Sequence, residues 1–314
     1  MVILIASKKV VEVEDLRKVY GSIIAVDGIS FEVHRGEIFG MVGPNAAGKT
    51  TTIECIEGLR QRDSGHIEVL GLDPQRDGYA LRERIGVQLQ IAVLPHNIKV
   101  WEACDLFASF YPRSTDWEVL LEKLGLAETR NSYFDKLSGG QKHRVFVALA
   151  LINDPELVFL DELTTGLDPR ARHAIWDLIR DIRKGGKTVF LTTHFMEEAE
   201  RLCDRVAIID HGRIVALDSP ENLIKSLGVE ARVVFNVEGD FDQKHLSRVR
   251  EATRIEQVGG RVIVYGQGDA LVERVVSTLS KKGIRYRDLR TEQPNLEDVF
   301  LALTGREMEG TEQR

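Results

Sequence analysis

The segment Gly43–Thr50, which reads GPNAAGKT, constrains the fold of this chain more than any other feature. It fits the pattern GxxxxGK followed by Ser or Thr. It lies after the apolar run Ile38–Val42 and before a helix that we expect to begin near Gly48. Successive backbone N–H groups and a helix N-terminus form a positive concavity for phosphate oxygens. A glycine-rich turn with a chance lysine is the alternative, and the strand–loop–helix setting argues against it. The sequence therefore predicts an α/β fold with a phosphate-binding loop.

The positions within this loop have separate expected roles. Lys49 reaches the β- and γ-phosphates of a nucleotide, and the Thr50 hydroxyl ligates Mg²⁺. Ala46 stands where a third glycine is common, and its Cβ is tolerable unless the backbone there needs a positive φ. We therefore predict ATP and Mg²⁺ as cofactors. The residues expected to bind the nucleotide here are Gly43, Pro44, Asn45, Ala46, Ala47, Gly48, Lys49, Thr50 and Thr51.

A pair of acids ends a second apolar run. Leu157–Leu160 has the length of a buried strand, and Asp161 and Glu162 follow it directly. Open α/β sheets bind ligands at the carboxyl ends of their strands. Asp161 suits Mg²⁺ coordination, and Glu162 suits polarising an attacking water. An exposed acidic turn is the alternative, which the phosphate-binding loop upstream makes less attractive.

The rest of residues 1–222 alternates short apolar runs with helical patterns, which predicts a mainly parallel sheet covered by helices. Thr188–Thr192 is one such run. Arg205–Asp210 and Arg213–Leu217 flank His211-Gly212 and predict a hairpin. A helical insertion is expected over about residues 98–150. Two of its helices are marked by Trp101, Leu106, Phe107 and Phe110, and by Leu120, Leu121 and Leu124.

Residues 223–305 change in character and predict a small α+β domain, followed by a flexible tail over 306–314. Alternating apolar residues indicate strands near Val233–Val237, Val262–Val264 and Ile284–Tyr286. One helix carries Leu271, Val272, Val275, Val276 and Leu279 on one face. A last helix, capped by Asn295, has Leu296, Val299, Phe300 and Leu303 at helical spacing.

The segment Leu137–Gln141, which reads LSGGQ, lies between the phosphate-binding loop and the acidic strand. With it the chain resembles the ABC ATPase family of P-loop NTPases over roughly residues 10 to 220. The resemblance implies that this signature binds the γ-phosphate held by the loop of a partner, so that two ATPase subunits, identical or paralogous, pair head to tail. The residues concerned are Ser138, Gly139, Gly140 and Gln141.

Four further positions match the family by type and place. The resemblance implies that Tyr20 stacks on adenine, although an edge-strand tyrosine is the plain alternative. It implies that Gln90 touches Mg²⁺ and relays to the membrane partner, with Gln88 as the competing choice. Asp168 resembles a residue that communicates across the dimer and also suits a helix N-cap. His194 resembles the histidine that senses γ-phosphate and, with Lys49, Glu162 and Gln90, completes the expected catalytic set.

Two residues depart from the family pattern. Leu163 replaces a common proline after the acidic pair, and His143 replaces a common polar residue after the signature. Neither departure removes a catalytic group. The C-terminal segment Asn295–Gly305 resembles a motif of drug-resistance exporter ATPases. That resemblance implies a separate ABC-2 type permease, a place on the cytoplasmic face of the cell membrane, and export of drugs, lipids or other amphipathic compounds.

The formal net charge of −7 gives no general case for nucleic-acid binding, and we expect no such partner. Three alternatives stay open. A soluble ABC ATPase of nucleic acid or the ribosome would usually carry two ATPase units, coiled coils or zinc insertions. An importer ATPase would usually carry a strand-rich regulatory tail. A non-hydrolysing regulatory domain would lack groups that are present here, namely Lys49, Asp161, Glu162 and His194.

Overall fold

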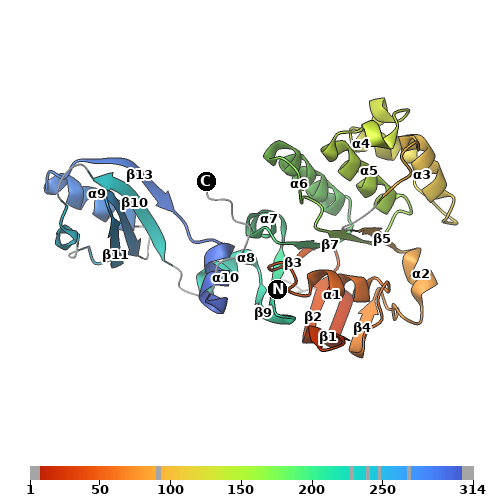
Figure 1. Ribbon diagram of the computed structural model, residues 1–314, viewed down its shortest axis with the longest axis horizontal. Helices are drawn as coiled ribbons and strands as arrows, with labels where there is room; N and C mark the ends of the chain where they lie inside the picture. Colours follow the sequence, from red (N-terminus) through yellow and green to blue (C-terminus); the bar gives the residue numbers. More distant parts are fainter. Residues whose placement is uncertain are drawn as a thin grey trace, which may run out of the picture. The chain divides into compact units, whose positions relative to one another are not determined.

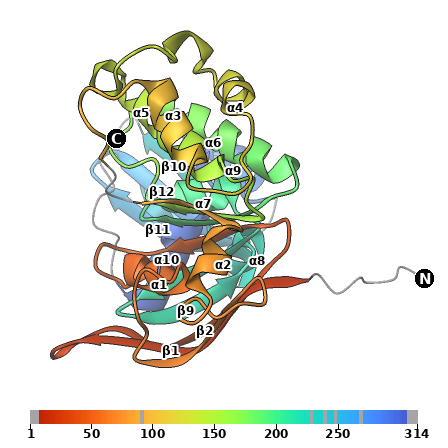
Figure 2. The ribbon, with the colours of Figure 1, turned by 90° about the vertical axis from the view of Figure 1, so that its right-hand side faces the viewer.

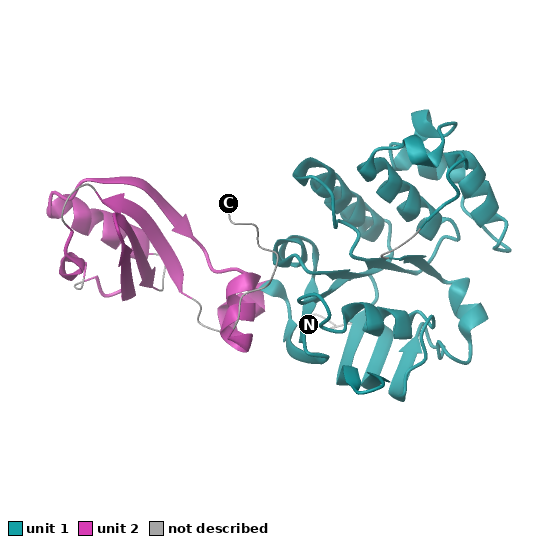
Figure 3. Ribbon diagram, in the orientation of Figure 1, with its two compact units in different colours: residues 1–220, 308–314 teal, residues 221–307 magenta. Residues whose placement is uncertain are grey.

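The computed structural model describes residues 8–89, 93–226, 230–237, 241–246, 249–266 and 270–305. The chain forms two compact units (Figure 3), which divide between Pro220 and Glu221, close to the boundary expected after residue 222. Within the described ranges, no helix combines the length and the apolar character that crossing a bilayer requires.

Unit 1 is built around a six-stranded sheet in the order β5-β6-β7-β3-β8-β9. Its strands pair in parallel except for β9, which forms the predicted hairpin with β8. Strands β3, β6 and β7 are buried along their whole length, because helices cover both faces of a parallel sheet. The strand bounds are β3 Ile38–Val42, β5 Ile85–Gln88, β6 Leu157–Asp161, β7 Thr188–Thr193, β8 Arg205–Asp210 and β9 Arg213–Asp218.

Helices lie on the two faces of this sheet (Figures 1 and 2). In Figure 1, α1 lies between the six-stranded sheet and a second sheet, while α5 and α6 lie on the opposite face. The helices of unit 1 outside the insertion are α1 Lys49–Ile56, α2 Gly78–Arg82, α6 Pro169–Lys184 and α7 Met196–Leu202. The α1 and α6 bounds follow from local signals, since Gly48 adopts a left-handed conformation before α1 and Asp168 caps α6.

The second sheet of unit 1 is antiparallel and has the order β2-β1-β4. Its strands are β1 Lys9–Tyr20, β2 Ile23–His34 and β4 Ser64–Val69. The two sheets share one apolar core, and aromatic rings connect them: the Phe31 ring of β2 stacks on Phe39 of β3 at 5.4 Å between centroids, and Phe39 contacts Phe190 of β7 at 5.3 Å. This core fixes α1, and with it the end of the phosphate-binding loop.

The insertion is helical, as the sequence predicts. Its elements are α3 Val100–Ala108, α4 Trp117–Lys123, two short 3₁₀ turns at Ala127–Thr129 and Phe134–Lys136, and α5 Gly139–Leu151. Of the four apolar residues that mark α3 in the sequence, Trp101 and Phe107 are half-buried, but the other two are not buried. Leu106 is exposed, and Phe110 lies beyond the helix end and is also exposed. Ala103 and Cys104 are fully buried instead, because small side chains let α3 pack closely against α5.

Unit 2 is an antiparallel sheet in the order β11-β12-β10-β13 with α9 packed on β10. Its elements are β10 Ala231–Val237, a short 3₁₀ turn at Gln243–His245, β11 Ala252–Val258, β12 Arg261–Gly266, α9 Leu271–Lys281, β13 Tyr286–Glu292 and α10 Leu296–Thr304; α8 Pro220–Ser226 precedes them. Val233 and Phe235 of β10 and Val275 of α9 belong to one apolar core. Asn295 caps α10 through a reciprocal hydrogen bond with Asp298, which confirms the predicted cap.

Candidate nucleotide-binding site

Two glycines of the loop Gly43–Thr50 are required by close backbone packing. A Cβ on Gly43 would lie 2.1 Å from the Ile209 carbonyl oxygen, and one on Gly48 would lie 2.4 Å from that of Ala25. Gly48 also has a φ of 104°. The loop is thus pressed against β8 and β2, and its shape is set by backbone contacts that no side chain could replace.

Ala46 departs from what its side chain prefers. Its φ is 62°, so the backbone at this position does lie in the left-handed region, where a Cβ carries an energetic penalty. A non-glycine residue in this region is strained by about 1 kcal/mol. The side chain is exposed, so the strain comes from the backbone alone and not from crowding.

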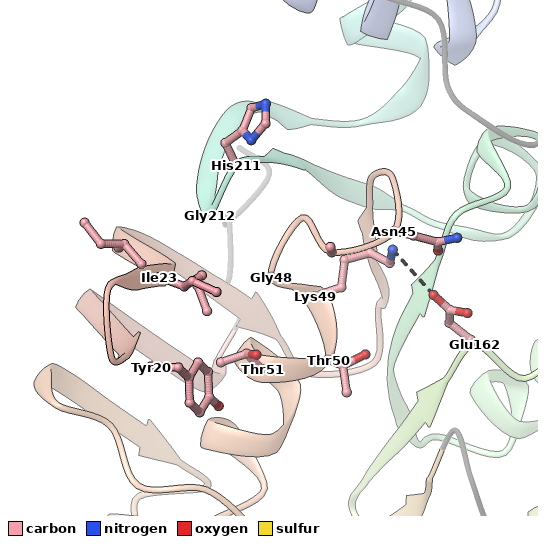
Figure 4. A pocket seen from close by; sticks show the side chains of 13 residues that line it. Tyr20, Ile23, Asn45, Gly48, Lys49, Thr50, Thr51, Glu162, His211 and Gly212 are labelled. Carbon is pink, nitrogen blue, oxygen red and sulfur yellow. Dashed lines mark ion pairs between the residues drawn. The ribbon is translucent and has the colours of Figure 1, made fainter.

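Lys49 is buried at the mouth of the loop. Its Nζ donates to the carbonyl oxygens of Gly43 at 2.8 Å and Pro44 at 3.0 Å, and lies 3.4 Å from Glu162 Oε1 (Figure 4). Burial lowers the pKa of Lys49, while the charge of Glu162 opposes that change. A bound phosphate would stabilise this ammonium group, because a buried cation interacts more favourably with an anion than with neutral carbonyl partners.

Asp161 and Glu162 occupy the end of β6, as predicted. The Asp161 carboxylate accepts a hydrogen bond from Thr192 of β7. Burial raises the pKa of Asp161, and hydrogen bonds from Thr192 and Thr50 oppose that rise. Asp161 and Thr50 supply oxygen donors of the kind that Mg²⁺ prefers, and the buried carboxylate would gain from a cation, so these residues fit that metal.

Glu162 has a strained backbone with a φ of 48°. Its N–H donates to the Thr192 carbonyl oxygen at 3.1 Å, which holds this conformation. His194, at the end of β7, places Nδ1 3.4 Å from Glu162 Oε2, and this contact lowers the pKa of Glu162 although burial raises it. Glu162 therefore stays ionised between Lys49 and His194.

Lys49, Thr50 and Glu162 line a pocket of about 540 Å³ (Figure 4), whereas Asp161 and His194 lie outside its lining. Eight predicted residues line it: Tyr20, Asn45, Ala46, Gly48, Lys49, Thr50, Thr51 and Glu162. The lining also contains five residues that the sequence pattern does not predict: Ile23, Ile24, Ala25, His211 and Gly212. Gly212 was placed in a hairpin turn, but its hydrogen bond from N–H to the Ala47 carbonyl oxygen at 2.9 Å joins segments far apart in the sequence.

Tyr20 lies at the far side of the pocket from Glu162 (Figure 4). Lys18 and Arg60 lie 5.5 Å and 5.3 Å from its ring centroid, which fixes the ring by cation–π contacts. Together with the aliphatic side chains of Ile23 and Ile24, the ring forms an apolar slot. Such a slot suits a flat nucleotide base, which would stack on the ring. The slot carries few polar groups that would recognise the hydrogen-bonding edges of that base.

The remaining predicted residues do not line this pocket. Ser138 and Gln141 form a capping box at the start of α5, and Gly139 lines a separate cavity of about 220 Å³. Asp168 accepts hydrogen bonds from the N–H groups of Arg170 and Ala171, each at 3.0 Å, as an N-cap does. Gln90 lies outside the described residues. Its competitor Gln88 is buried in β5.

Known proteins are similar to this chain over most of its length. The family model described as "ABC transporter" matches residues 26–165. A protein of Ralstonia nicotianae named "Nod factor export ATP-binding protein I" is 40% identical, over 97% of this chain and 96% of its own length. A protein of the same name from a Rhizobium species is 41% identical, over 96% of this chain and 99% of its own length.

Solved structures agree in fold. A structure titled "Structure of ATP binding subunit of ABC transporter" has a TM-score of 0.63 and 29% identity, and covers 70% of this chain and 93% of its own. A second, an ATP-binding cassette of an ABC transporter, has a TM-score of 0.65 at 22% identity over 71% of this chain and 97% of its own, which bears on the fold alone. The chain therefore belongs to the ATP-binding proteins of ABC transporters, a family of P-loop ATPases that bind and hydrolyse ATP.

Proposed function

We propose that this chain is the ATP-hydrolysing subunit of an ABC exporter, and that two ATPase subunits close around two MgATP. The observation that supports this most directly is the position of Glu162. Its carboxylate lies 3.4 Å from Lys49 Nζ and 3.4 Å from His194 Nδ1, in the lining of a pocket of about 540 Å³. An ionised carboxylate beside a phosphate-binding lysine suits the orientation of an attacking water.

The nucleotide would lie with its base on Tyr20 and its phosphates on the loop Gly43–Thr51. The backbone N–H groups at the start of α1 would bind phosphate oxygens, and Lys49 would exchange its carbonyl partners for the β- and γ-phosphates. Thr50 and Asp161 would hold Mg²⁺, with Gln90 as a further ligand. When bound, this cation neutralises charge that develops on the transferred phosphoryl group.

The chemical step would use residues on three different elements. Glu162 orients water in line with the γ-phosphate, and Lys49 stabilises the charge on its oxygens. His194 holds the Glu162 carboxylate from β7 and responds to the γ-phosphate. Each group is buried or half-buried, so its electrostatic effect is stronger than it would be in water.

The second half of each site would come from a second ATPase subunit. The start of α5, with Ser138, Gly139, Gly140 and Gln141, presents N–H groups but does not line the pocket of its own chain. These groups would therefore bind the γ-phosphate on the partner. Asp168, at the start of α6, would contact the same interface, and the pair would be related head to tail.

A separate ABC-2 type permease that spans the cell membrane would complete the transporter, with this chain at the cytoplasmic face of that membrane. The relatives named for Nod factor export support an export direction. Leu106 and Phe110 expose apolar side chains on the helical insertion, which suits contact with another protein. We assign nucleotide binding to residues 1–222 and an accessory role to residues 223–305.

The test uses Glu162→Gln in the full-length chain, with Lys49→Ala for contrast. We expect Glu162→Gln to bind MgATP with near wild-type affinity, to form a stable dimer, and to lose roughly 100- to 10,000-fold in kcat. Lys49→Ala should instead lose nucleotide affinity. Size-exclusion chromatography with light scattering, nucleotide titration and phosphate release measure these outcomes. Ordinary turnover by Glu162→Gln, or a monomer even with the permease supplied, would refute the proposal.

A further inference from the structure

Glu198 is a buried carboxylate of α7 that the nucleotide pocket does not include. Only 3% of it is exposed. Its Oε1 accepts a hydrogen bond from the Trp176 indole N–H at 2.9 Å, and its Oε2 accepts one from the Thr164 hydroxyl at 3.1 Å. A carboxylate has only acceptor oxygens when ionised, so a buried one must be surrounded by donors.

The donors of Glu198 come from the segment that follows Glu162. Thr164 is two residues beyond Glu162 and is itself almost fully buried. Its carbonyl oxygen accepts from the Leu167 N–H at 3.2 Å, which leads directly to the Asp168 cap of α6. Trp176 lies on α6. The bond to Thr164 therefore holds the loop between the expected catalytic acid and the expected interface residue.

Glu198 is also connected to His194, because it lies on the helix that follows that residue. Helix α7 begins two residues after His194, and the Phe195 N–H donates to the Thr193 hydroxyl at 3.0 Å. Burial raises the pKa of Glu198, and hydrogen bonds from Thr193, Trp176 and Thr164 oppose that rise. Glu198 therefore lies on the helix that directly continues the segment of His194, while its carboxylate accepts a hydrogen bond from Thr164 in the loop after β6.

We propose that Glu198 is a positioning residue that ties the loop after Glu162 to the segment carrying His194, so that both groups face the γ-phosphate in register. The inference rests on the roles proposed above for Glu162 and His194. The 3.4 Å contact between those two side chains depends on two separate segments. Glu198 bonds to the first segment through Thr164 and lies on helix α7, which directly continues the second. Misplacement of a reacting group by about 1 Å can cost 100-fold in rate, so a partial loosening has a measurable effect.

The test compares Thr164→Val, Thr164→Ser and Glu198→Gln in the full-length chain. Valine removes the hydroxyl with little change of shape, serine retains it, and glutamine offers one acceptor oxygen for two donors. We expect Thr164→Val and Glu198→Gln each to lower kcat about 10-fold with the ATP dissociation constant unchanged within about 2-fold. Thr164→Ser should keep most of the activity. Glu197→Gln is the matched control, because Glu197 lies beside Glu198 on α7 but pairs with Arg201 at the surface.

The double variant Thr164→Val/Glu198→Gln tests whether the two single changes act through the same hydrogen bond. If one bond carries the effect, the double variant loses about 10-fold and not 100-fold. Independent losses that multiply, or wild-type kcat in both single variants with only a lower melting temperature, would overturn the inference. Its failure is distinct from failure of the proposed function. An inactive Glu162→Gln with a fully active Thr164→Val removes only the role of Glu198.

Discussion

The two units differ in what they bury. In the described residues, every buried charged or polar side chain lies in unit 1, and among these are Lys49, Asp161, Glu162 and Glu198. Unit 2 buries apolar side chains, such as Val233, and keeps its charges at least partly exposed. Burying a charge costs free energy unless partners offset the cost. Unit 1 therefore bears a cost that a purely structural core avoids.

Unit 2 also uses its polar residues differently. The Tyr265 hydroxyl donates to Glu256 at 2.9 Å, and the Arg254 guanidinium lies 4.0 Å from the Tyr265 ring centroid. These contacts lie on the partly exposed face of the sheet. Exposed contacts of this kind contribute little to stability and do little to change reactivity. The comparison indicates that the reactive groups lie in unit 1, where most side chains with perturbed pKa values are found.

The largest expected effect tests whether the core of unit 2 is purely structural. Phe235 is fully buried in the apolar core between β10 and α9, and it contacts Phe241 and Tyr286. We expect Phe235→Ala to lower the free energy of unfolding of this unit by about 3–5 kcal/mol through a cavity. At temperatures where the fold persists, kcat should be unchanged. Urea denaturation and phosphate release measure the two quantities.

A matched control on the same sheet is Val258→Ala. Val258 lies at the end of β11 and is 76% exposed, so its truncation should change stability by less than about 0.5 kcal/mol. A Phe235→Ala protein that stays folded but loses ATPase activity would break the comparison, because unit 2 would then take part in hydrolysis.

A smaller effect concerns Glu57, which is buried in unit 1 yet lies outside the pocket. Among the described residues, neither of its carboxylate oxygens has a hydrogen-bond partner. Burial raises the pKa of Glu57 well above its usual value, and the charges of Asp161 and Glu54 add to this. The native state therefore binds a proton that the unfolded state releases above about pH 4.3, and stability falls as pH rises.

Glu57→Gln removes this proton linkage while keeping the shape of the side chain. We expect the variant to be more stable than wild type by about 1–3 kcal/mol at pH 8, with a smaller difference at pH 5 and with kcat unchanged. Urea denaturation at both pH values measures this, with Glu68→Gln on the exposed face of β4 as the control. A variant less stable than wild type at pH 8 would mean that the Glu57 carboxylate is needed in its ionised form.

The sequence predicted those parts of the site that rest on local signals. The loop Gly43–Thr50, the acids that end β6 and the β8–β9 hairpin each lie within one short segment, so pattern and spacing suffice. His211 and Ile23 were missed as pocket residues because tertiary packing brings them there. The Asp27 N–H donates to the Gly212 carbonyl oxygen at 2.9 Å, which joins β2 to the hairpin.

Two errors in the fold have related causes. Strand β11, Ala252–Val258, was not predicted, because its only apolar residue apart from the two ends is Ile255 and its order comes from pairing with β12. The buried face of α3 was misassigned because large apolar side chains marked it in the sequence. The contact with α5 selects the small residues Ala103 and Cys104 instead. Neither packing partner is visible in a local window.

The smallest expected effect sharpens the comparison within unit 1, by asking how much strain the phosphate-binding loop retains. Ala46 has a φ of 62°, while Ala47 beside it has an ordinary backbone and is buried. Glycine at position 46 relieves about 1 kcal/mol of strain but adds flexibility to the unfolded chain, which offsets about 0.4–1 kcal/mol. We therefore expect Ala46→Gly to change the free energy of unfolding by at most about 1 kcal/mol, in the stabilising direction.

Ala47→Gly is the matched control for this change, because it adds the same unfolded-state flexibility without relieving strain. It should lower the free energy of unfolding by about 0.5–1 kcal/mol, as thermal denaturation without nucleotide would show. If Ala46→Gly destabilises the protein as much as Ala47→Gly does, the left-handed backbone at Ala46 carries no net strain. The loop would then tolerate alanine for the same reason that it tolerates Glu162 at a φ of 48°: surrounding hydrogen bonds hold the backbone in place.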